Sequence, residues 1–235
     1  MVKTAKEEEL SIAISEYDSR KVEALLSKNK SIDVNVKDED GHIPLHIAIA
    51  AYNQAETTHE SQQAIEIIKL LIKNNADFTI KDAEGLTSVH LLAWTQNTET
   101  QYIHEILKLL PDNVLNIPAT NGKIPLHYAA VSKGNRIMIE HLIKKGSNVN
   151  AKDVVDHTPL QDAMDDDNAQ SMDILLKKGV FENFNITGTL ISKGQELQNM
   201  HISNKAIESA LTICDAPEAE KLDALYILGL WQEID

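Results

Sequence analysis

The apolar residues of this chain are grouped in short runs of helical length, and several of these runs end in lysine followed by asparagine or glycine. The clearest examples are residues 65–75 (IEIIKLLIKNN), 138–146 (MIEHLIKKG) and 171–179 (SMDILLKKG). Lysine is favourable at the negative, C-terminal end of a helix, and glycine or asparagine tolerates the left-handed backbone that ends one. The pattern therefore predicts a series of helices with a common type of C-terminus.

A second phrase recurs between these helices. It occurs as DEDGHIPLHIAIA at residues 38–50, DAEGLTSVHLLAW at 82–94, ATNGKIPLHYAAV at 119–131 and DVVDHTPLQDAMD at 153–165. Its histidines, and the glutamine that replaces the last one, follow one another at 44, 37 and 34 residues (His46, His90, His127, Gln161). These spacings indicate a unit of about 33 residues with insertions in some copies.

Together the two phrases resemble the ankyrin-repeat family, whose consensus reads roughly D-x-x-G-x-T-P-L-H-x-A, a second helix ending in L-L, and G-A-D-V-N-A. The resemblance covers residues 7–186 and gives units at 7–37, 38–81, 82–118, 119–152 and 153–186. It implies an all-α solenoid of stacked helix-turn-helix units, an ankyrin-repeat domain of residues 1–186, with a helical C-terminal extension or cap at 187–235. No single unit buries its apolar face alone, so each stacks on the next.

The motif residues have structural roles in this interpretation. Glycine suits a tight turn, and proline suits an early helical position where a missing N–H costs nothing. The resemblance implies that the motif histidine forms local hydrogen bonds that stabilise the turn. Histidines more than 30 residues apart, at the same place in different repeats, do not converge on a metal, so we expect neither metal binding nor catalysis there. The motif residues are Gly41, Gly85, Gly122, Pro44, Pro125, Pro159, His46, His90 and His127.

Departures from the consensus predict local weakness. Ile43 and Ile124 stand where the family has a capping threonine, and a lost helix cap costs about 1 kcal/mol. The third unit lacks the Pro-Leu pair and the closing glycine, so we expect irregular geometry around residues 105–118. In the fifth unit Asp156 replaces the turn glycine, and aspartate tolerates that backbone better than most residues.

Two insertions and a tail depart further from the repeat. Extra residues at 52–62 and 95–100 fall between the two helices of their units, as a binding face or as tolerated surface loops. After residue 186, helices are predicted at 204–213 and 215–234. The apolar stretch ALYILGLW within the second must be buried, either as a cap on the last repeat or in a partner.

Charge and composition limit the partners and the compartment. The net charge is −14; residues 1–150 hold 16 basic and 20 acidic side chains, and residues 151–235 hold 6 and 16. Nucleic acid is therefore not an expected partner, whereas the acidity suits either a basic protein surface or simple solubility. No apolar run approaches the ~18 residues of a membrane span, and the first residues lack the apolar stretch of a secretory signal. With a single cysteine, Cys214, we expect a cytoplasmic protein (of the source cell, or in the host cytosol if an effector), monomeric and without cofactor.

The function predicted is a non-enzymatic protein-interaction scaffold or adaptor. The sequence holds no G-x-S-x-G, phosphate-binding glycine loop or H-E-x-x-H motif. The aspartate run at residues 161–170 (QDAMDDDNAQ) lacks the glycine and glutamate of a calcium loop. The alternative is a translocated bacterial effector or adaptor whose C-terminal helices recruit a second protein.

The resemblance implies that partners contact the turn tips and the groove lined by the first helices. At the tips these positions are Glu39, Asp40, His42, Ala83, Glu84, Leu86, Thr120, Asn121, Lys123, Val154, Val155 and His157. In the groove they are Ala50, Ala51, Trp94, Thr95, Val131, Ser132, Asp162, Asp165 and Asp166. Trp94 is either an exposed binding residue or packed beneath the third-unit insertion. The aspartates are either a patch for a basic partner or a solvated face.

Overall fold

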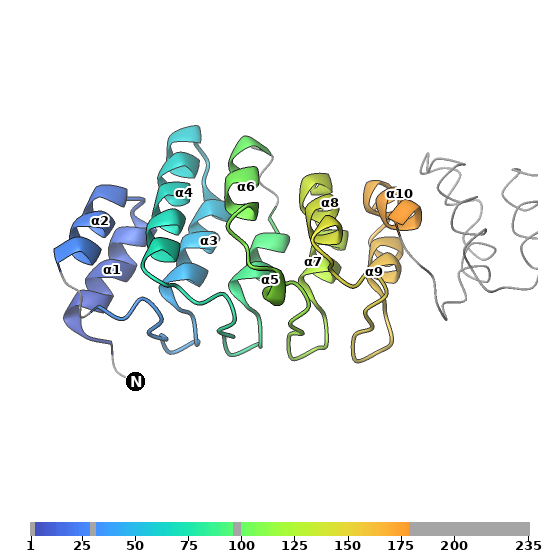
Figure 1. Ribbon diagram of the computed structural model, residues 1–235, viewed down its shortest axis with the longest axis horizontal. Coiled ribbons are helices and arrows are strands. Elements are labelled where there is room, and N and C mark those ends of the chain that lie inside the picture. The colour runs from blue at the N-terminus through green and yellow to red at the C-terminus, as the bar shows by residue number, and fades with distance from the viewer. Residues whose placement is uncertain (1–2, 29–31, 96–99, 179–235) are drawn as a thin grey trace, which may run out of the picture.

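The computed structural model describes residues 3–28, 32–95 and 100–178, which form a row of helix pairs (Figure 1). The pairs are α1 (Ala5–Ser15) with α2 (Ser19–Lys28), α3 (Pro44–Gln54) with α4 (Thr58–Lys73), α5 (Ser88–Ala93) with α6 (Thr100–Leu107), α7 (Pro125–Val131) with α8 (Arg136–Lys144), and α9 (Pro159–Asp165) with α10 (Ala169–Lys178). Within these residues there is no strand, only an isolated bridge between Lys81 and Thr87. The predicted all-α fold is confirmed.

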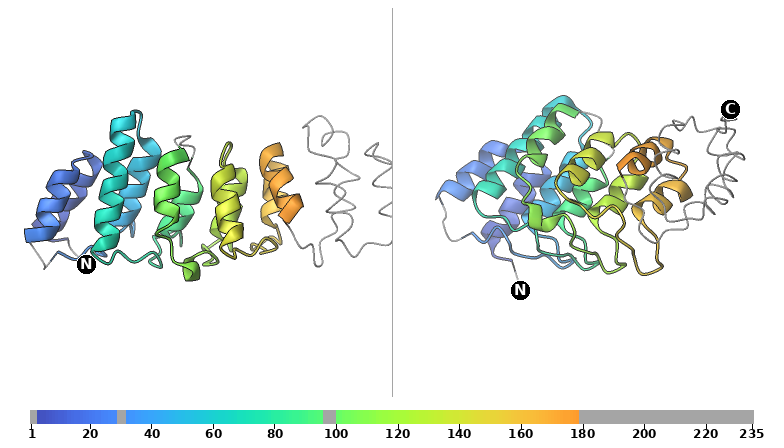
Figure 2. Two further views of the ribbon diagram at one scale, coloured as in Figure 1. Left: turned by 45° about the horizontal axis from the view of Figure 1, so that its top comes forward. Right: turned by 45° about the vertical axis from the view of Figure 1, so that its right-hand side comes forward.

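The helices form two layers. The first helices of the pairs (α1, α3, α5, α7 and α9) lie side by side, and the second helices form a parallel outer row (Figure 2). The turns that join one pair to the next project from the same edge of the stack (Figure 1). This repetition places the same position of every unit in one line along the molecule.

Aliphatic side chains fill the space between the layers. Leu45, Val89, Leu126 and Leu160, which begin the inward face of the first helices, are at most 2 % exposed. Small residues lie where neighbouring helices approach each other, and Ala48, Ala93, Ala129 and Ala163 are fully buried. Each unit thus shares its core with the units on either side.

Hydrogen bonds to an aspartate and between backbones shape the turns. Asp82 Oδ1 accepts hydrogen bonds from the N–H groups of Glu84 (2.9 Å) and Leu86 (2.8 Å). Asp38 and Asp153 do the same in their own turns. The units are also joined by their backbones, since the N–H of Val154 donates to the carbonyl of Asn121 at 3.1 Å. Tip positions are therefore held by hydrogen bonds both within a turn and between turns.

Most of the residues at 52–62 lengthen helices α3 and α4, and only residues 55–57 connect the two helices. Helix α3 continues to Gln54, and α4 begins at Thr58. Thr57 caps α4: its Oγ1 accepts from the N–H of Glu60 at 3.1 Å, and Glu60 Oε2 accepts from the N–H of Thr57 at 3.0 Å. The surface-loop interpretation was wrong for residues 52–54 and 58–62, which are helical, and the capping box favours the helix at 58–62. The binding-face interpretation stays a prediction.

The third unit is irregular, as its sequence predicts. Helix α5 has only 6 residues and α6 has 8. The chain then forms a 3-10 turn, Asp112–Val114, after Pro111. Asp156 adopts the left-handed backbone expected of it, with φ of 65°.

The predicted C-terminal helices at 204–213 and 215–234 lie outside the described residues, as does Cys214. The division of the chain into residues 1–186 and 187–235, the capping role of the tail and its recruitment role stay predictions.

Replacing Gly122 with alanine should destabilise the protein more than replacing Gly134. Both glycines have φ near +80°, so both substitutions carry the strain of a left-handed Cβ. A Cβ at Gly122 also lies 2.8 Å from the backbone nitrogen of Val154 in the next turn, whereas a Cβ at Gly134 meets nothing within 4 Å. We expect Gly134→Ala to cost about 1–2 kcal/mol, and Gly122→Ala clearly more, by urea unfolding. Equal shifts in the urea midpoint would contradict the role given to the contact between turns.

The third unit should be the least protected of the internal units. Its helices are short, and stability in a repeat stack is roughly a sum of units and their interfaces. Amide hydrogen exchange should therefore be faster in α5 and α6 than in α7 and α8. Equal protection of α6 and α8 would count against this prediction.

Candidate protein-interaction face

Three motif histidines each tie their own helix to the next turn. The Nδ1 atoms of His46, His90 and His127 accept from the backbone N–H of the N-cap residue at 3.0–3.2 Å. Because Nδ1 accepts, the proton of the neutral ring must be on Nε2. That N–H donates to the carbonyl of Leu86, Lys123 and His157 respectively, at 3.3, 3.1 and 3.0 Å. The bonds match the structural role predicted for these residues.

Ile43 and Ile124 leave their helices without a side-chain cap, as the sequence indicates. The histidine three residues later accepts from the N–H of the isoleucine itself and does not replace the missing cap, so the weakness expected there stays a prediction. Retained Thr87 does not cap the helix either; its hydroxyl lies 2.8 Å from His90 Nδ1. Only Thr158 among these four bonds a helical N–H with its side chain, that of Gln161 at 3.3 Å.

Other residues form the hydrogen bond to the N-cap N–H in the first and fifth units. In the fifth unit Gln161 Oε1 accepts from the N–H of Thr158 at 3.2 Å. In the first, Glu7 accepts from the N–H of Thr4 at 2.7 Å and from that of Asp33 at 3.3 Å. The hydrogen bond from the backbone N–H of Thr4 lowers the pKa of Glu7 below its ordinary value. Its effect on the pKa is larger than the opposite effect of burial.

The turn tips and first helices leave an exposed face that combines aromatic and acidic residues. Trp94, the C-cap residue of α5, is 53 % exposed, and the inserted residues 96–99 that follow it lie outside the described residues. Its ring centroid lies 6.1 Å from that of Tyr128 on α7, which also makes an edge contact of 5.4 Å with His90. Asn121 Nδ2 donates to the hydroxyl of Tyr128 at 3.1 Å. The two aromatic rings are thus positioned by the repeat framework.

Lys123 joins two carboxylates from the fifth unit. Its ammonium group forms an ion pair with Asp162 and lies 3.4 Å from Asp153. Burial alone raises the pKa of Asp153, but hydrogen bonds from the N–H groups of His157 and Val155, together with Lys123, lower it below its ordinary value. His157 Nδ1 lies 3.6 Å from Asp162 and 3.5 Å from Asp165. This cluster links the fourth and fifth units.

Burial separates the predicted contact residues into two groups. Exposed or half-buried are Glu39, Asp40, His42, Ala83, Glu84, Thr120, Asn121, Lys123, Val154, Val155 and His157 at the tips, and Ala50, Trp94, Val131, Asp165 and Asp166 in the groove. Leu86, Ala51, Thr95 and Ser132 are at most 8 % exposed, so these four predictions are wrong. Asp162 is also wrong as a free contact residue, because it is 5 % exposed and paired with Lys123.

Comparison with known proteins identifies the repeat. The family model for ankyrin repeats in three copies matches residues 59–153 and 101–187, more than half of the chain. The chain belongs to the ankyrin-repeat family. Ankyrin repeats are a protein–protein interaction module, so this is the general function that the fold indicates.

Several ankyrin proteins of different organisms are similar to this chain. An ankyrin repeat protein of variola virus is 28 % identical over 205 residues, which cover 86 % of this chain and 31 % of the viral protein. A putative ankyrin repeat protein of Rickettsia bellii is 33 % identical over 112 residues (46 % and 60 %), and dog inversin is 30 % identical over 159 residues (64 % and 13 %). The chain thus spans less than two thirds of each of these relatives.

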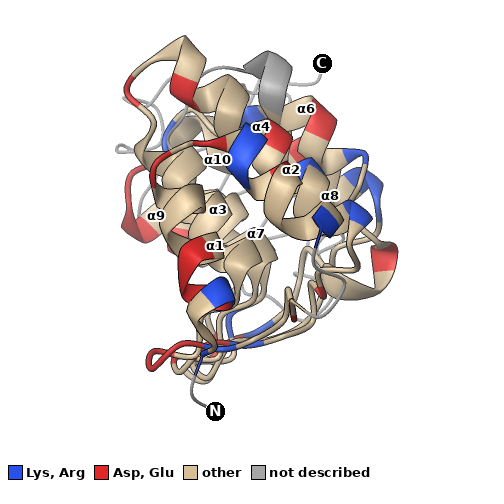
Figure 3. Ribbon diagram, turned by 90° about the vertical axis from the view of Figure 1, so that its left-hand side faces the viewer, with Lys and Arg blue, Asp and Glu red and all other residues tan. Residues whose placement is uncertain are grey.

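Charge is unevenly distributed over the ankyrin stack. Figure 3 looks along the row of helices and shows acidic segments at the turn tips and beside α9, whereas several basic segments lie around α4 and α8. Val154 and Val155, exposed by 71 % and 65 %, add an apolar tip beside α9. In the described residues no helix is long and apolar enough to span a bilayer.

Asp38, Asp40 and His42 bring potential ligand atoms within 4.8 Å of one another in one turn. Asp38 Oδ1 accepts from the N–H groups of Asp40 (3.1 Å) and His42 (2.7 Å). The hydrogen bonds of the turn account for this cluster.

Sequence reasoning missed Tyr128. It directly follows the motif histidine, where the second and third units have Ile47 and Leu91. An aromatic residue at this position, one repeat away from Trp94, was the available signal. What could not be seen was that the two rings meet, because that depends on how α5 and α7 pack.

Stability should decrease as the pH falls from about 6.5 to 4. Burial lowers the pKa of His46 and of His90 to about 4, and also lowers that of His127, from an ordinary 6.5. In this range the unfolded chain binds more protons than the folded one, so each histidine removes up to about 1.4 kcal/mol of stability per pH unit. Above pH 6.5 this stabilisation is fully present. Urea unfolding between pH 4 and 8 measures the slope.

His127→Gln should make this slope shallower, because glutamine does not titrate. The fold should accept the change, since Gln161 already forms the same cap bond in the fifth unit. His59→Gln is the matched control, since His59 is exposed. If both variants have the wild-type slope, the buried histidines are not the source of the pH dependence.

Proposed function

We propose that this protein binds an extended segment of a partner protein along the face formed by the turn tips and first helices, and that the segment carries basic residues next to an apolar or arginine side chain. The observation that carries the proposal is the exposed Trp94 beside Tyr128 on a face that is otherwise rich in carboxylates.

Trp94 is the proposed anchor. Tryptophan is among the residues that contribute most to binding energy in interfaces, and more than half of this side chain is open to solvent. Its contact with Tyr128 holds the indole in place, so less side-chain freedom is lost on binding. An arginine or aliphatic side chain of the partner fits above such a pair of rings.

The carboxylates supply the preference for basic partners. Asp165 and Asp166 are exposed at the end of α9, and Glu39, Asp40 and Glu84 are exposed at the tips. On a chain of net charge −14 they add to a negative field that speeds the approach of a basic segment.

Capture from a cell lysate, followed by variants, tests the proposal. Full-length protein on beads should retain a partner that Trp94→Ala loses by at least about tenfold. The folded state should change little, because Trp94 ends its helix and is exposed. Circular dichroism and the unfolding midpoint control for that. A partner retained equally by wild type and Trp94→Ala would not bind through this face.

Replacing both Asp165 and Asp166 with asparagine should slow association of the captured partner, mostly at low salt, where screening is weak. The matched control is Glu23→Gln with Glu66→Gln, which removes two exposed charges from the outer helices α2 and α4. Stopped-flow association rates at low and high ionic strength make the comparison. Identical rates for the three proteins at low salt would leave the acidic face as a solubility feature.

A further inference from the structure

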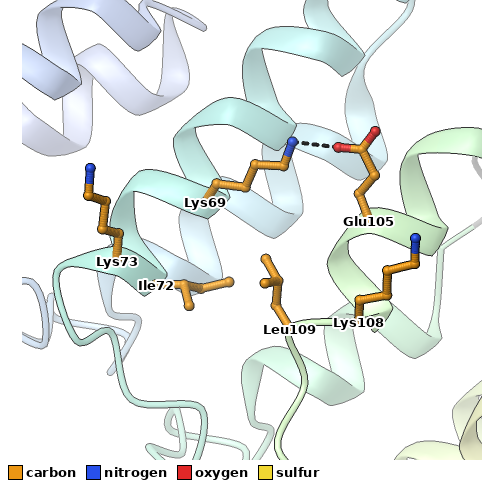
Figure 4. Close-up of a pocket in the computed structure, with 6 residues that line it drawn as sticks. All are labelled: Lys69, Ile72, Lys73, Glu105, Lys108 and Leu109. Atoms are coloured by element: carbon orange, nitrogen blue, oxygen red, sulfur yellow. Dashed lines mark hydrogen bonds and ion pairs between the residues drawn. The ribbon is translucent and has the colours of Figure 1, made fainter.

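The outer row of helices contains a pocket of about 340 Å³. It lies between α4 and α6 and is lined by Lys69, Ile72, Lys73, Glu105, Lys108 and Leu109. Figure 4 shows the side chains of Ile72 and Leu109 pointing toward each other across the floor, with the lysines around them. Its volume is at the lower end of the ~300–1,000 Å³ typical of ligand sites.

The pocket arises where α4 and α6 leave apolar side chains partly open on the outer surface. The buried residues of the two helices correspond at a spacing of 39, since Ile67, Ile68 and Leu71 match Ile106, Leu107 and Leu110. Leu109 therefore corresponds to Leu70, and Lys108 to Lys69. Leu109 is 40 % exposed, whereas Leu70 is half-buried.

The charges around this apolar floor are mostly positive. Lys69 forms an ion pair with Glu105 across the gap between the helices (Figure 4). Lys73 and Lys108 have no ion-pair partner among the described residues. Lysine near a helix C-terminus is favourable in itself, but that does not account for an exposed leucine between two such lysines. An apolar floor with two available ammonium groups is unusual on a chain of net charge −14.

We propose that this pocket docks an acidic segment of a partner protein, which places an aliphatic side chain on Ile72 and Leu109 and carboxylates against Lys73 and Lys108. Charge complementarity selects the occupant: the acidic tip and groove face repels such a segment, and this outer surface attracts it. The site is separate from the face proposed above, so each proposal stands or fails by itself.

The probe is a short fluorescein-labelled peptide with leucine set among glutamates, titrated with full-length protein and followed by fluorescence anisotropy. Two matched peptides separate the two parts of the site: glutamine replaces glutamate in one, and alanine replaces leucine in the other. We expect both to bind more weakly than the acidic leucine peptide. Binding should also weaken at high salt, since exposed ion pairs are screened.

Variants of the protein locate the binding. Lys73→Gln and Lys108→Gln should each weaken binding about two- to fivefold, as expected for exposed ion pairs. Lys133→Gln is the control: it removes an exposed lysine outside the pocket. Leu109→Lys is the sharper test, because Leu109 is 40 % exposed and a lysine at this position can extend into solvent. It adds positive charge yet should weaken binding roughly fivefold by removing the apolar floor.

Four results would overturn the proposal. Absence of binding, or equal binding by all variants, would show that the pocket docks no such segment. Stronger binding by Leu109→Lys would indicate a general attraction of acidic chains to lysines. A peptide of residues 215–235 of this chain that binds more tightly than the acidic leucine peptide would make the occupant this chain itself instead of a partner.

Discussion

The bond from a buried histidine to the carbonyl of the next turn determines how successive units are aligned. One ring caps its own helix through Nδ1 and reaches the following unit through Nε2, so local structure and stacking depend on the same side chain. Its neutral state is necessary, because a protonated Nδ1 could no longer accept from the backbone. The turn glycines also bring successive units together, because the backbone of the next turn lies too close for any Cβ at Gly41, Gly85 or Gly122. The alignment of the units therefore depends on buried histidines and on backbone contacts. Substitutions of surface side chains leave both intact.

A framework held in this way leaves its surfaces free to differ. On the inner side, Trp94 and Tyr128 come from consecutive first helices and meet only because those helices are adjacent. On the outer side, Ile72 and Leu109 come from consecutive second helices and share one pocket. Each feature is a property of two neighbouring repeats, and neither exists in a single unit. The ankyrin stack thus creates sites at its interfaces between units.

Charge divides these surfaces further. Carboxylates at the tips and on α9 face one side, and part of the lysine content lies on the outer helices (Figure 3). Some charges serve the fold instead of a partner: Lys123 neutralises Asp153 and Asp162 between two units. Buried or half-buried pairs of this kind explain why a count of aspartates overstates the acidic surface that a partner can meet.

The sequence by itself determined the repeat, because its period, its helix-ending lysines and its turn glycines each follow from local backbone chemistry. It also indicated the irregular third unit and the left-handed backbone at Asp156, which are local effects too. It failed for Leu86 and Asp162, whose positions in the unit suggested exposure: both side chains are buried in the stack, and the adjoining unit supplies Lys123 to Asp162. It also failed for most of residues 52–62, where a capping box favours a helix in an apparent loop. Only the tertiary structure decided which side chains meet across repeats, since those contacts depend on the distance and rotation between units that are more than 30 residues apart in the chain.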